Sequence, residues 1–168
     1  MDSYTEQILQ KKSGLREKLN YFISGLVLLA GITFVCFVSL SLGILLVAVS
    51  CFLFYYAKLS YDVEYEYIFT NGDCDIARIK SKEFRKTIYA FQEADVQRVM
   101  KFTSGSFQNE LEVNSKLNLK DFTSGIESNK ENWYAFMING KDTTYAVVME
   151  LSEKSLEHIT KIFKNKVQ

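Results

Sequence analysis

The sequence predicts an α+β protein: a hairpin of two transmembrane helices, then an antiparallel β-sheet or partly open barrel capped by a C-terminal helix. Three observations support this prediction. The chain carries no charged residue over positions 21–57, alternates apolar and polar residues from Val63 onward, and ends in an amphipathic pattern after Ser152. The expected parts are a cytoplasmic amphipathic segment (1–19), the transmembrane hairpin (20–59) and a cytoplasmic β domain with its helix (60–168).

The composition argues against several classes of function. Twenty basic residues balance twenty acidic ones in the 168-residue chain, whereas nucleic-acid-binding domains usually carry a basic excess. We therefore expect no nucleic-acid partner. The three cysteines, Cys36, Cys51 and Cys74, match no zinc or redox spacing, and their odd number gives no hint of a disulfide framework, which suits a reducing compartment.

The uncharged segment is too long for one membrane crossing. As a single helix, residues 21–57 would be about 55 Å long, against roughly 30 Å for the bilayer core. Folded in two at a turn near residues 39–43, each half nearly matches the bilayer. We predict helices over about residues 20–38 and 42–58. A cleaved signal peptide and a re-entrant hairpin are the competing interpretations, but the apolar run greatly exceeds a signal-peptide core.

Charges around the hairpin predict its orientation. Basic residues flank the apolar segment, and the turn between the helices has none, so the positive-inside rule places both termini in the cytoplasm of a two-span cell-membrane protein. Tyrosines fall at the same membrane face, as in an aromatic belt. The predicted interface anchors are Lys11, Lys12, Arg16, Lys18, Tyr21, Tyr55, Tyr56 and Lys58.

The two spans are expected to anchor the protein. They contain no Asp, Glu, Lys, Arg or His, whereas transport paths and proton relays usually need such groups within the membrane. Small residues let neighbouring membrane helices approach closely. The candidates for this contact are Ser24, Gly25, Ala30 and Gly31.

The first nineteen residues carry a helical signal. Residues 3–6 (SYTE) fit a capping box, and Tyr4, Ile8, Leu15 and Leu19 recur near helical spacing. We expect either an amphipathic helix on the inner leaflet or a loosely helical tail that only sets topology.

A β-hairpin is predicted directly after the spans. Asn71-Gly72 is the favoured pair for a two-residue type I′ turn. Pairing about this turn opposes Phe69 to Cys74 and Tyr67 to Ile76, which gives one aromatic face toward a core. Further strands are expected over residues 86–91, 132–140 and 143–151. Residues 93–102 fit either a turn that leads into a strand over residues 96–102 or one helical turn. Residues 103–131 are polar and unusually long for a loop.

The chain is expected to end in a helix. Ser152 is a good N-cap, and Glu157 and Lys161 form an i, i+4 ion pair. The predicted apolar face comprises Leu156, Ile159, Ile162 and Phe163.

These residues resemble bacterial pleckstrin-homology-like membrane proteins. More narrowly, the chain is similar to a domain-of-unknown-function family of small Gram-positive membrane proteins with an N-terminal transmembrane hairpin. The matching residues are Glu6-Gln7, Lys11-Lys12, Tyr65–Tyr67, Thr70–Asp73, Asp75, Ile76, Ile79 and Ser152–Ile159. The resemblance covers nearly the whole chain and implies a PH-like fold, with no assigned function and no catalytic residues.

The resemblance also directs attention to lipid binding. Eukaryotic relatives of this fold bind phosphoinositides through basic residues around the first hairpin loop, but here Asp73 and Asp75 make that loop acidic and repel phosphate. Basic residues gather instead between the second and third strands, where each adds about 1 kcal/mol near an anionic leaflet. The candidate lipid- or partner-binding residues are Lys80, Lys82, Arg85 and Lys86. The alternative is a solvated turn without a ligand.

Together these patterns predict an integral membrane protein that presents a non-enzymatic interaction domain at the cytoplasmic membrane face. The expected contacts are anionic lipid, a protein partner or a second copy, and the alternative is an accessory or regulatory subunit of a larger membrane complex. No catalytic triad, phosphate loop, dinucleotide fingerprint or metal cluster is present in the sequence. We expect no catalytic residues, no metal and no cofactor, and His158 is expected at the surface.

Overall fold

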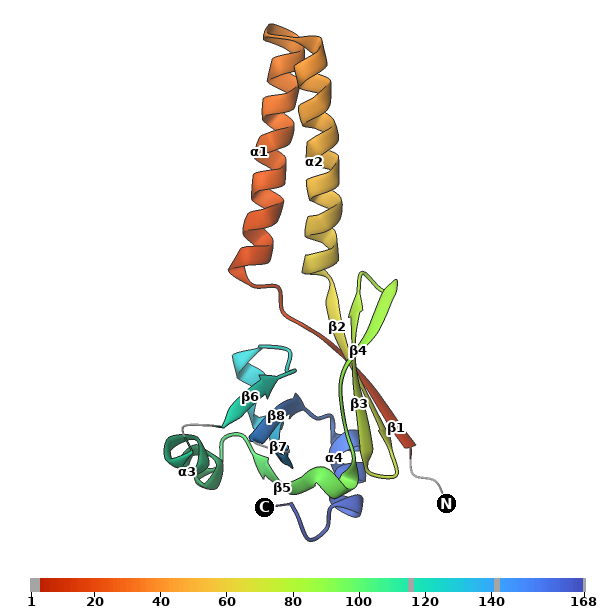
Figure 1. Ribbon diagram of the computed structural model, residues 1–168, viewed down its shortest axis with the longest axis vertical. Coiled ribbons are helices and arrows are strands. Elements are labelled where there is room, and N and C mark those ends of the chain that lie inside the picture. Colours follow the sequence, from red (N-terminus) through yellow and green to blue (C-terminus); the bar gives the residue numbers. More distant parts are fainter. Residues whose placement is uncertain (1–3, 115–116, 141–142, 168) are drawn as a thin grey trace. The chain divides into compact units, whose positions relative to one another are not determined.

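Two long helices and two four-stranded sheets dominate the computed structural model, which describes residues 4–114, 117–140 and 143–167. These residues divide into two units (Figure 1). The helical unit contains Lys12–Val63 and Ile79–Phe84. The sheet unit contains the described residues of Met1–Lys11, Glu64–Arg78 and Arg85–Gln168.

The helical unit is the predicted hairpin. Helix α1 (Leu15–Phe37) and helix α2 (Leu40–Tyr61) are joined at Val38 and Ser39. Helix α1 begins five residues before its predicted start and ends one residue before its predicted end, and α2 extends beyond both of its predicted bounds. Each is long and apolar enough to cross a membrane. Only 11% of the apolar window in α1 and 17% of that in α2 is buried, so these side chains are not the core of a soluble domain.

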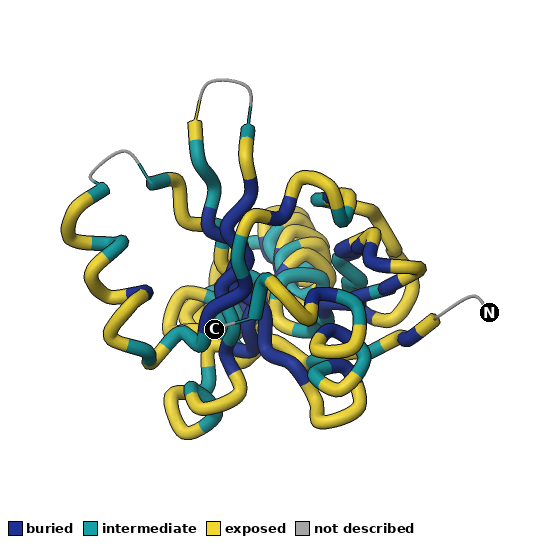
Figure 2. The backbone as a smooth tube through the Cα atoms, turned by 90° about the horizontal axis from the view of Figure 1, so that it is seen from below, coloured by how far each residue is buried: buried dark blue, intermediate teal, exposed yellow. Residues whose placement is uncertain are grey.

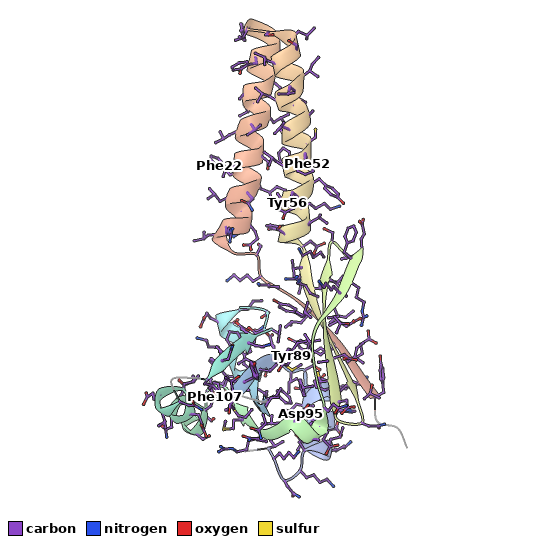
Figure 3. The ribbon with its side chains drawn as sticks, in the orientation of Figure 1. Phe22, Phe52, Tyr56, Tyr89, Asp95 and Phe107 are labelled. Atoms are coloured by element: carbon purple, nitrogen blue, oxygen red, sulfur yellow. The ribbon has the colours of Figure 1, made fainter. Side chains whose placement is uncertain are left out.

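Small residues form the seam between the two helices. The buried residues of α1 are Ser24 and Gly31, and those of α2 are Gly43, Ser50 and Ala57. Neighbours within each set lie seven positions apart, which returns a residue to the same helix face after two turns. The large side chains point outward: Phe22, Phe52 and Tyr56 are 64%, 68% and 62% exposed (Figure 3).

Of the small residues predicted to let the helices approach, two lie in the seam. Ser24 and Gly31 are buried there, and a Cβ added at Gly31 would lie 2.9 Å from Val47 Cγ2. Gly25 was wrongly assigned to this contact, because a Cβ there would meet nothing within 4 Å.

The first sheet has the order β1-β2-β3-β4. It contains β1 (Tyr4–Gln10), β2 (Val63–Thr70), β3 (Asp73–Lys80) and β4 (Phe84–Phe91). Strand β1 pairs antiparallel with β2, from Tyr4 opposite Thr70 to Gln10 opposite Glu64. The whole helical hairpin is therefore inserted between two paired strands.

The helical prediction for the first residues was wrong, because Tyr4–Gln10 form a strand. The same residues alternate with period two: Thr5 is buried and Leu9 packs against the core, whereas Tyr4 and Ile8 are more than half exposed. Pairing with β2 supplies the backbone hydrogen bonds that a short isolated helix would have to provide alone. Tertiary pairing thus overrides the local capping signal.

The predicted β2–β3 turn is confirmed. Asn71 and Gly72 both have positive φ, 51° and 97°, as a type I′ turn requires. The predicted aromatic face is also buried, with Tyr67, Phe69 and Ile76 fully enclosed in the main core. Asn-Gly therefore sets the register that turns this face inward.

The second sheet has the order β5-β7-β8-β6. It contains β5 (Val96–Lys101), β6 (Asn118–Asp121), β7 (Trp133–Asn139) and β8 (Thr144–Glu150). Antiparallel pairs join β5 to β7 and β7 to β8, but β6 pairs parallel with β8. The fold is accordingly α+β without a closed barrel.

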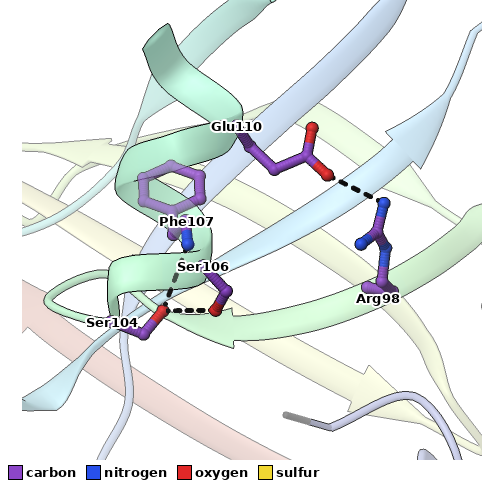
Figure 4. Close-up of polar contacts among 5 residues, drawn as sticks. All are labelled: Arg98, Ser104, Ser106, Phe107 and Glu110. Carbon is purple, nitrogen blue, oxygen red and sulfur yellow. Dashed lines mark hydrogen bonds and ion pairs between the residues drawn. The ribbon is translucent and has the colours of Figure 1, made fainter. Parts of the chain in front are cut away.

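The polar segment over residues 103–131 is not a simple loop. It contains helix α3 (Gly105–Val113), β6 and the start of a 3₁₀ helix, η2 (Glu127–Asn132). The ambiguous segment before it forms a 3₁₀ turn, η1 (Glu93–Asp95), and then β5. Ser104 caps α3 by accepting from the Phe107 N–H at 3.3 Å, and Arg98 of β5 pairs with Glu110 at 2.9 Å (Figure 4).

Helix α4 (Glu153–Ile162) closes the sheet unit as predicted. Ser152 caps it, and the Lys161 ammonium lies 2.7 Å from the Glu157 carboxylate. The predicted apolar face packs on the main core, and Figure 2 shows the buried residues gathered along the strands. His158 was wrongly expected at the surface: it is half-buried, 6.1 Å from the Phe69 ring.

Cys74 is enclosed in this core, and burial raises the pKa of its thiol well above the usual 9.0. In a chain carrying Cys36→Ser and Cys51→Ser, we expect thiol labelling at neutral pH to be at least about 100-fold slower in the native state than in denaturant, because the thiolate forms only on opening. Comparing the two labelling rates tests this. Equal rates would contradict it.

The same burial predicts alkaline instability. Burial also raises the pKa of Tyr67, so both groups are held neutral in the folded chain. Above the unfolded thiol's pKa of 9.0, the unfolded chain releases its protons first, and the free energy of unfolding falls as pH rises. Below that pH, these two groups leave stability unchanged.

Candidate functional site

The predicted basic cluster begins in the β3–β4 turn. Ser81 and Lys82 are its central residues, with φ of 49° and 59°, and the Glu83 N–H donates to the Lys80 carbonyl at 3.1 Å. Left-handed backbone costs a residue with a side chain roughly 1–2 kcal/mol. The backbone of Ser81 and Lys82 is therefore strained in this turn, whereas Asn-Gly would adopt the same conformation with little strain.

Hydrogen bonds fasten this turn to the C-terminal end of α2. The Ser81 N–H donates to the Asp62 carbonyl at 2.7 Å, and its hydroxyl donates to the Lys58 carbonyl at 3.4 Å. The Lys58 carbonyl also accepts from the Asp62 N–H at 3.2 Å, so Ser81 adds two hydrogen bonds to backbone acceptors at the C-terminal end of α2. Ser81 is buried although it lies at the tip of a turn.

Cationic and aromatic side chains accompany this contact. Lys58 and Lys82 are exposed, Lys80 is half-buried, and the rings of Phe84 and Tyr61 are 53% and 42% exposed. Mixed lysine and aromatic side chains are the usual composition of a membrane-interface belt. We call Lys58, Lys80, Lys82 and Phe84 the basic turn surface.

The structure divides the four predicted basic residues. Lys80 and Lys82 belong to the helical unit, whereas Arg85 and Lys86 belong to the sheet unit. Arg85 Nε donates to the Glu66 carboxylate at 2.5 Å, and Glu66 is buried. Arg85 therefore already has a carboxylate partner within the first sheet. Lys86 is exposed on β4.

The predicted interface anchors also fall into two groups. Those at the start of α1 and the end of α2 lie at the same end of the antiparallel hairpin: Arg16, Lys18, Tyr21, Tyr55, Tyr56 and Lys58. Lys12 is exposed in the connector before α1. Lys11 belongs to the sheet unit, where its ammonium lies 5.9 Å from the centre of the Tyr65 ring.

A buried carboxylate that sequence reasoning missed organises the sheet unit. Glu150 is 5% exposed and accepts hydrogen bonds from the Ser124 N–H at 3.1 Å, the Ser124 hydroxyl at 2.5 Å, Asn129 at 2.8 Å and the Trp133 indole at 3.2 Å. These donors occupy its acceptor sites. Glu150 therefore has a structural role, and its only sequence signal is a charge at the end of an apolar strand.

Gln7 makes a second connection that the sequence did not reveal. Its side-chain amide donates to the Glu150 carbonyl at 2.8 Å and accepts from the Ser152 N–H at 2.9 Å. The first strand is thereby fastened to the junction between β8 and α4. Among the described residues, no three His, Cys, Asp or Glu side chains are grouped so as to hold a metal.

The fold defines a class: two apolar helices of membrane-spanning length carry an α+β domain of two sheets with a C-terminal helix. A family profile described as Bacterial PH-like domain (DUF6106) matches residues 1–168, so the chain belongs to this bacterial PH-like family. PH-like domains are generally non-enzymatic. No curated protein and no solved structure matches the chain.

Proposed function

We propose that this protein is a non-catalytic interaction module held at the cytoplasmic face of the cell membrane. In this proposal the hairpin crosses the bilayer with both termini in the cytoplasm, and the basic turn surface contacts anionic lipid. The observation that carries the proposal is the pair of hydrogen bonds from Ser81 to the end of α2. They hold the turn at the C-terminal end of α2, which in this proposal is where the spanning helix leaves the membrane.

Charge and burial support a lipid contact at this place. Each lysine near an anionic leaflet contributes about 1 kcal/mol, and an exposed Phe84 ring is favourable in the headgroup region. A strained turn persists when surrounding contacts hold it, and here Ser81 supplies them.

Chain connections keep the sheet unit within reach of the bilayer. Strands β1 and β2 pair on either side of the hairpin, and short connectors separate them from the helices: residues 11–14 before α1 and Asp62 after α2. Five peptide steps from Gln10 to Leu15 span at most roughly 17 Å. Two short connections confine the domain more strongly than one flexible linker.

An environment-sensitive fluorophore at position 82 tests the contact. The full chain with Lys82→Cys, Cys36→Ser and Cys51→Ser is reconstituted in nanodiscs of phosphatidylcholine alone or mixed with phosphatidylglycerol. We expect a blue shift of the emission that depends on phosphatidylglycerol and reverses in molar salt, because salt screens exposed charges. Identical spectra in both lipids would refute the contact.

Charge-matched variants control for net charge. Adding Lys58→Gln and Lys80→Gln should lower the membrane-bound population of the turn about fivefold per lysine, at about 1 kcal/mol each. Adding Lys154→Gln and Lys164→Gln, which remove the same charge from the exposed surface around α4, should preserve the shift. A C-terminal tag labelled from outside intact cells would contradict the cytoplasmic orientation.

A protein partner is the second candidate, either a second copy or the other subunits of a membrane complex. Strand β1 ends the sheet order, so its outer edge has no partner strand in the described part of the chain, and Tyr4 and Ile8 are exposed there. Such an edge can accept an added strand. Cross-linking in native membranes through Ile8→Cys tests this candidate, and recovery of monomer alone would count against it.

A further inference from the structure

An open pocket lies at the base of the helical hairpin. It has a volume of about 360 Å³ and is lined by Lys18 and Tyr21 of α1 and by Tyr61 of α2. This volume is at the lower end of the roughly 300–1,000 Å³ usual for small-molecule sites. All three lining residues belong to the helical unit, so the pocket is a feature of the hairpin itself.

Aromatic contacts hold the walls of this pocket. The Tyr21 and Tyr61 rings meet edge to face with centroids 5.3 Å apart, and Tyr21 also lies 6.2 Å from the Phe54 ring. Such pairs are favourable beyond their buried area. The Tyr21 ring is therefore braced by two residues of α2, and the pocket is formed before any ligand binds.

The lining offers donors and a positive charge. Lys18 is exposed and forms no ion pair with a carboxylate among the described residues. The hydroxyls of Tyr21 and Tyr61, which also line the pocket, donate to no acceptor in the described part of the chain. None of the three lining residues is acidic. One ammonium and two phenolic O–H groups suit the oxygens of a phosphodiester, and the ring faces suit the apolar part of the same molecule.

The position of the pocket on the spans selects a lipid over a soluble phosphate. Lys18 is the last charged residue of α1, and the exposed large side chains that follow it along the helix, from Leu19 and Phe22 onward, are apolar. A tyrosine pair at this level belongs to the headgroup region of a spanning hairpin. We propose that the pocket binds one anionic phospholipid, with its phosphate paired to Lys18 and hydrogen-bonded by the Tyr21 and Tyr61 hydroxyls.

This inference rests on the proposed membrane insertion and adds a specific lipid site. Native mass spectrometry of the full chain tests it, with phosphatidylglycerol and phosphatidylcholine added in equal amounts. We expect one phosphatidylglycerol to be retained in preference to phosphatidylcholine. Lys18→Gln should reduce that preference about tenfold, as expected for loss of a charge-assisted contact. Tyr61→Phe, which removes one hydroxyl, should reduce it about threefold.

Matched controls separate this site from general charge effects. Lys12→Gln removes the same charge outside the pocket and should leave the preference unchanged. An undiminished preference in Lys18→Gln, or an equal loss in Lys12→Gln, would overturn the inference, as would displacement of the lipid by millimolar inorganic phosphate.

Two further measurements distinguish failure of the lipid-site inference from failure of the proposed function. The Lys80→Gln, Lys82→Gln variant should retain the bound lipid. A chain that pellets with membranes but shows no preference for phosphatidylglycerol refutes the pocket alone, whereas a chain absent from the membrane pellet refutes insertion.

Discussion

Replacing Gly43 with leucine is expected to force α1 and α2 apart. A Cβ at this position would lie 2.4 Å from Val35 Cγ2 and 2.5 Å from the Val35 backbone nitrogen. Backbone cannot move aside as a flexible side chain can, so the cost is expected to reach about 3 kcal/mol. Spin labels on the exposed native thiols of Cys36 and Cys51 should then show a broader and longer distance distribution.

Gly25→Leu is the matched control on the same hairpin. A Cβ there would meet no atom within 4 Å, and leucine has the higher helix propensity, so the label distances should stay as in the parent chain. Gly31→Leu should behave like Gly43→Leu, because its Cβ would lie 3.0 Å from the Val47 backbone nitrogen. Unchanged distances in Gly43→Leu would show that the seam does not hold the helices together.

Glu150→Ala is expected to destabilise the sheet unit strongly. Truncation leaves the Trp133 indole and the Ser124 N–H without their acceptor in a buried site. Unsatisfied buried donors each cost about 1–3 kcal/mol, so we expect a total loss of about 3 kcal/mol. Trp133, the single tryptophan, contacts the altered site and reports urea unfolding by its fluorescence.

Glu131→Ala supplies the control for this loss. Its carboxylate pairs with Lys101 at 2.6 Å but is 72% exposed, and exposed pairs contribute at most about 1 kcal/mol. Glu150→Gln should fall between the two, since its amide oxygen still accepts while its amide N–H₂ meets donors. If the midpoints of Glu150→Ala and Glu131→Ala coincided, the buried network would have no stabilising role.

Several elements could be predicted because local chemistry leaves one solution. An uncharged segment of this length must double back, since a single helix would exceed the bilayer. Asn71-Gly72 demands a type I′ turn, because both residues tolerate positive φ. The spacing of Ile159 and Phe163 after an N-cap at Ser152 describes an amphipathic helix without reference to any distant residue.

Other elements depend on partners far away in the chain. The segment Tyr4–Gln10 carries helical and strand signals together, and pairing with β2 across the whole hairpin decides between them. Ser124 lies in a segment without a hydrophobic pattern, yet it is buried, and Glu150 accepts its hydrogen bonds. The ion pair between Arg85 and Glu66 joins residues of two strands, and no local pattern around Arg85 predicts it.

By itself the sequence determined the hairpin, the first β-turn and the final helix, because charge, length and side-chain period act locally along the chain. Tertiary structure alone decided the strand at the N-terminus, the division of the basic residues and the buried network around Glu150. These features rest on hydrogen bonds and ion pairs between residues distant in sequence, and no local pattern records which donor meets which acceptor.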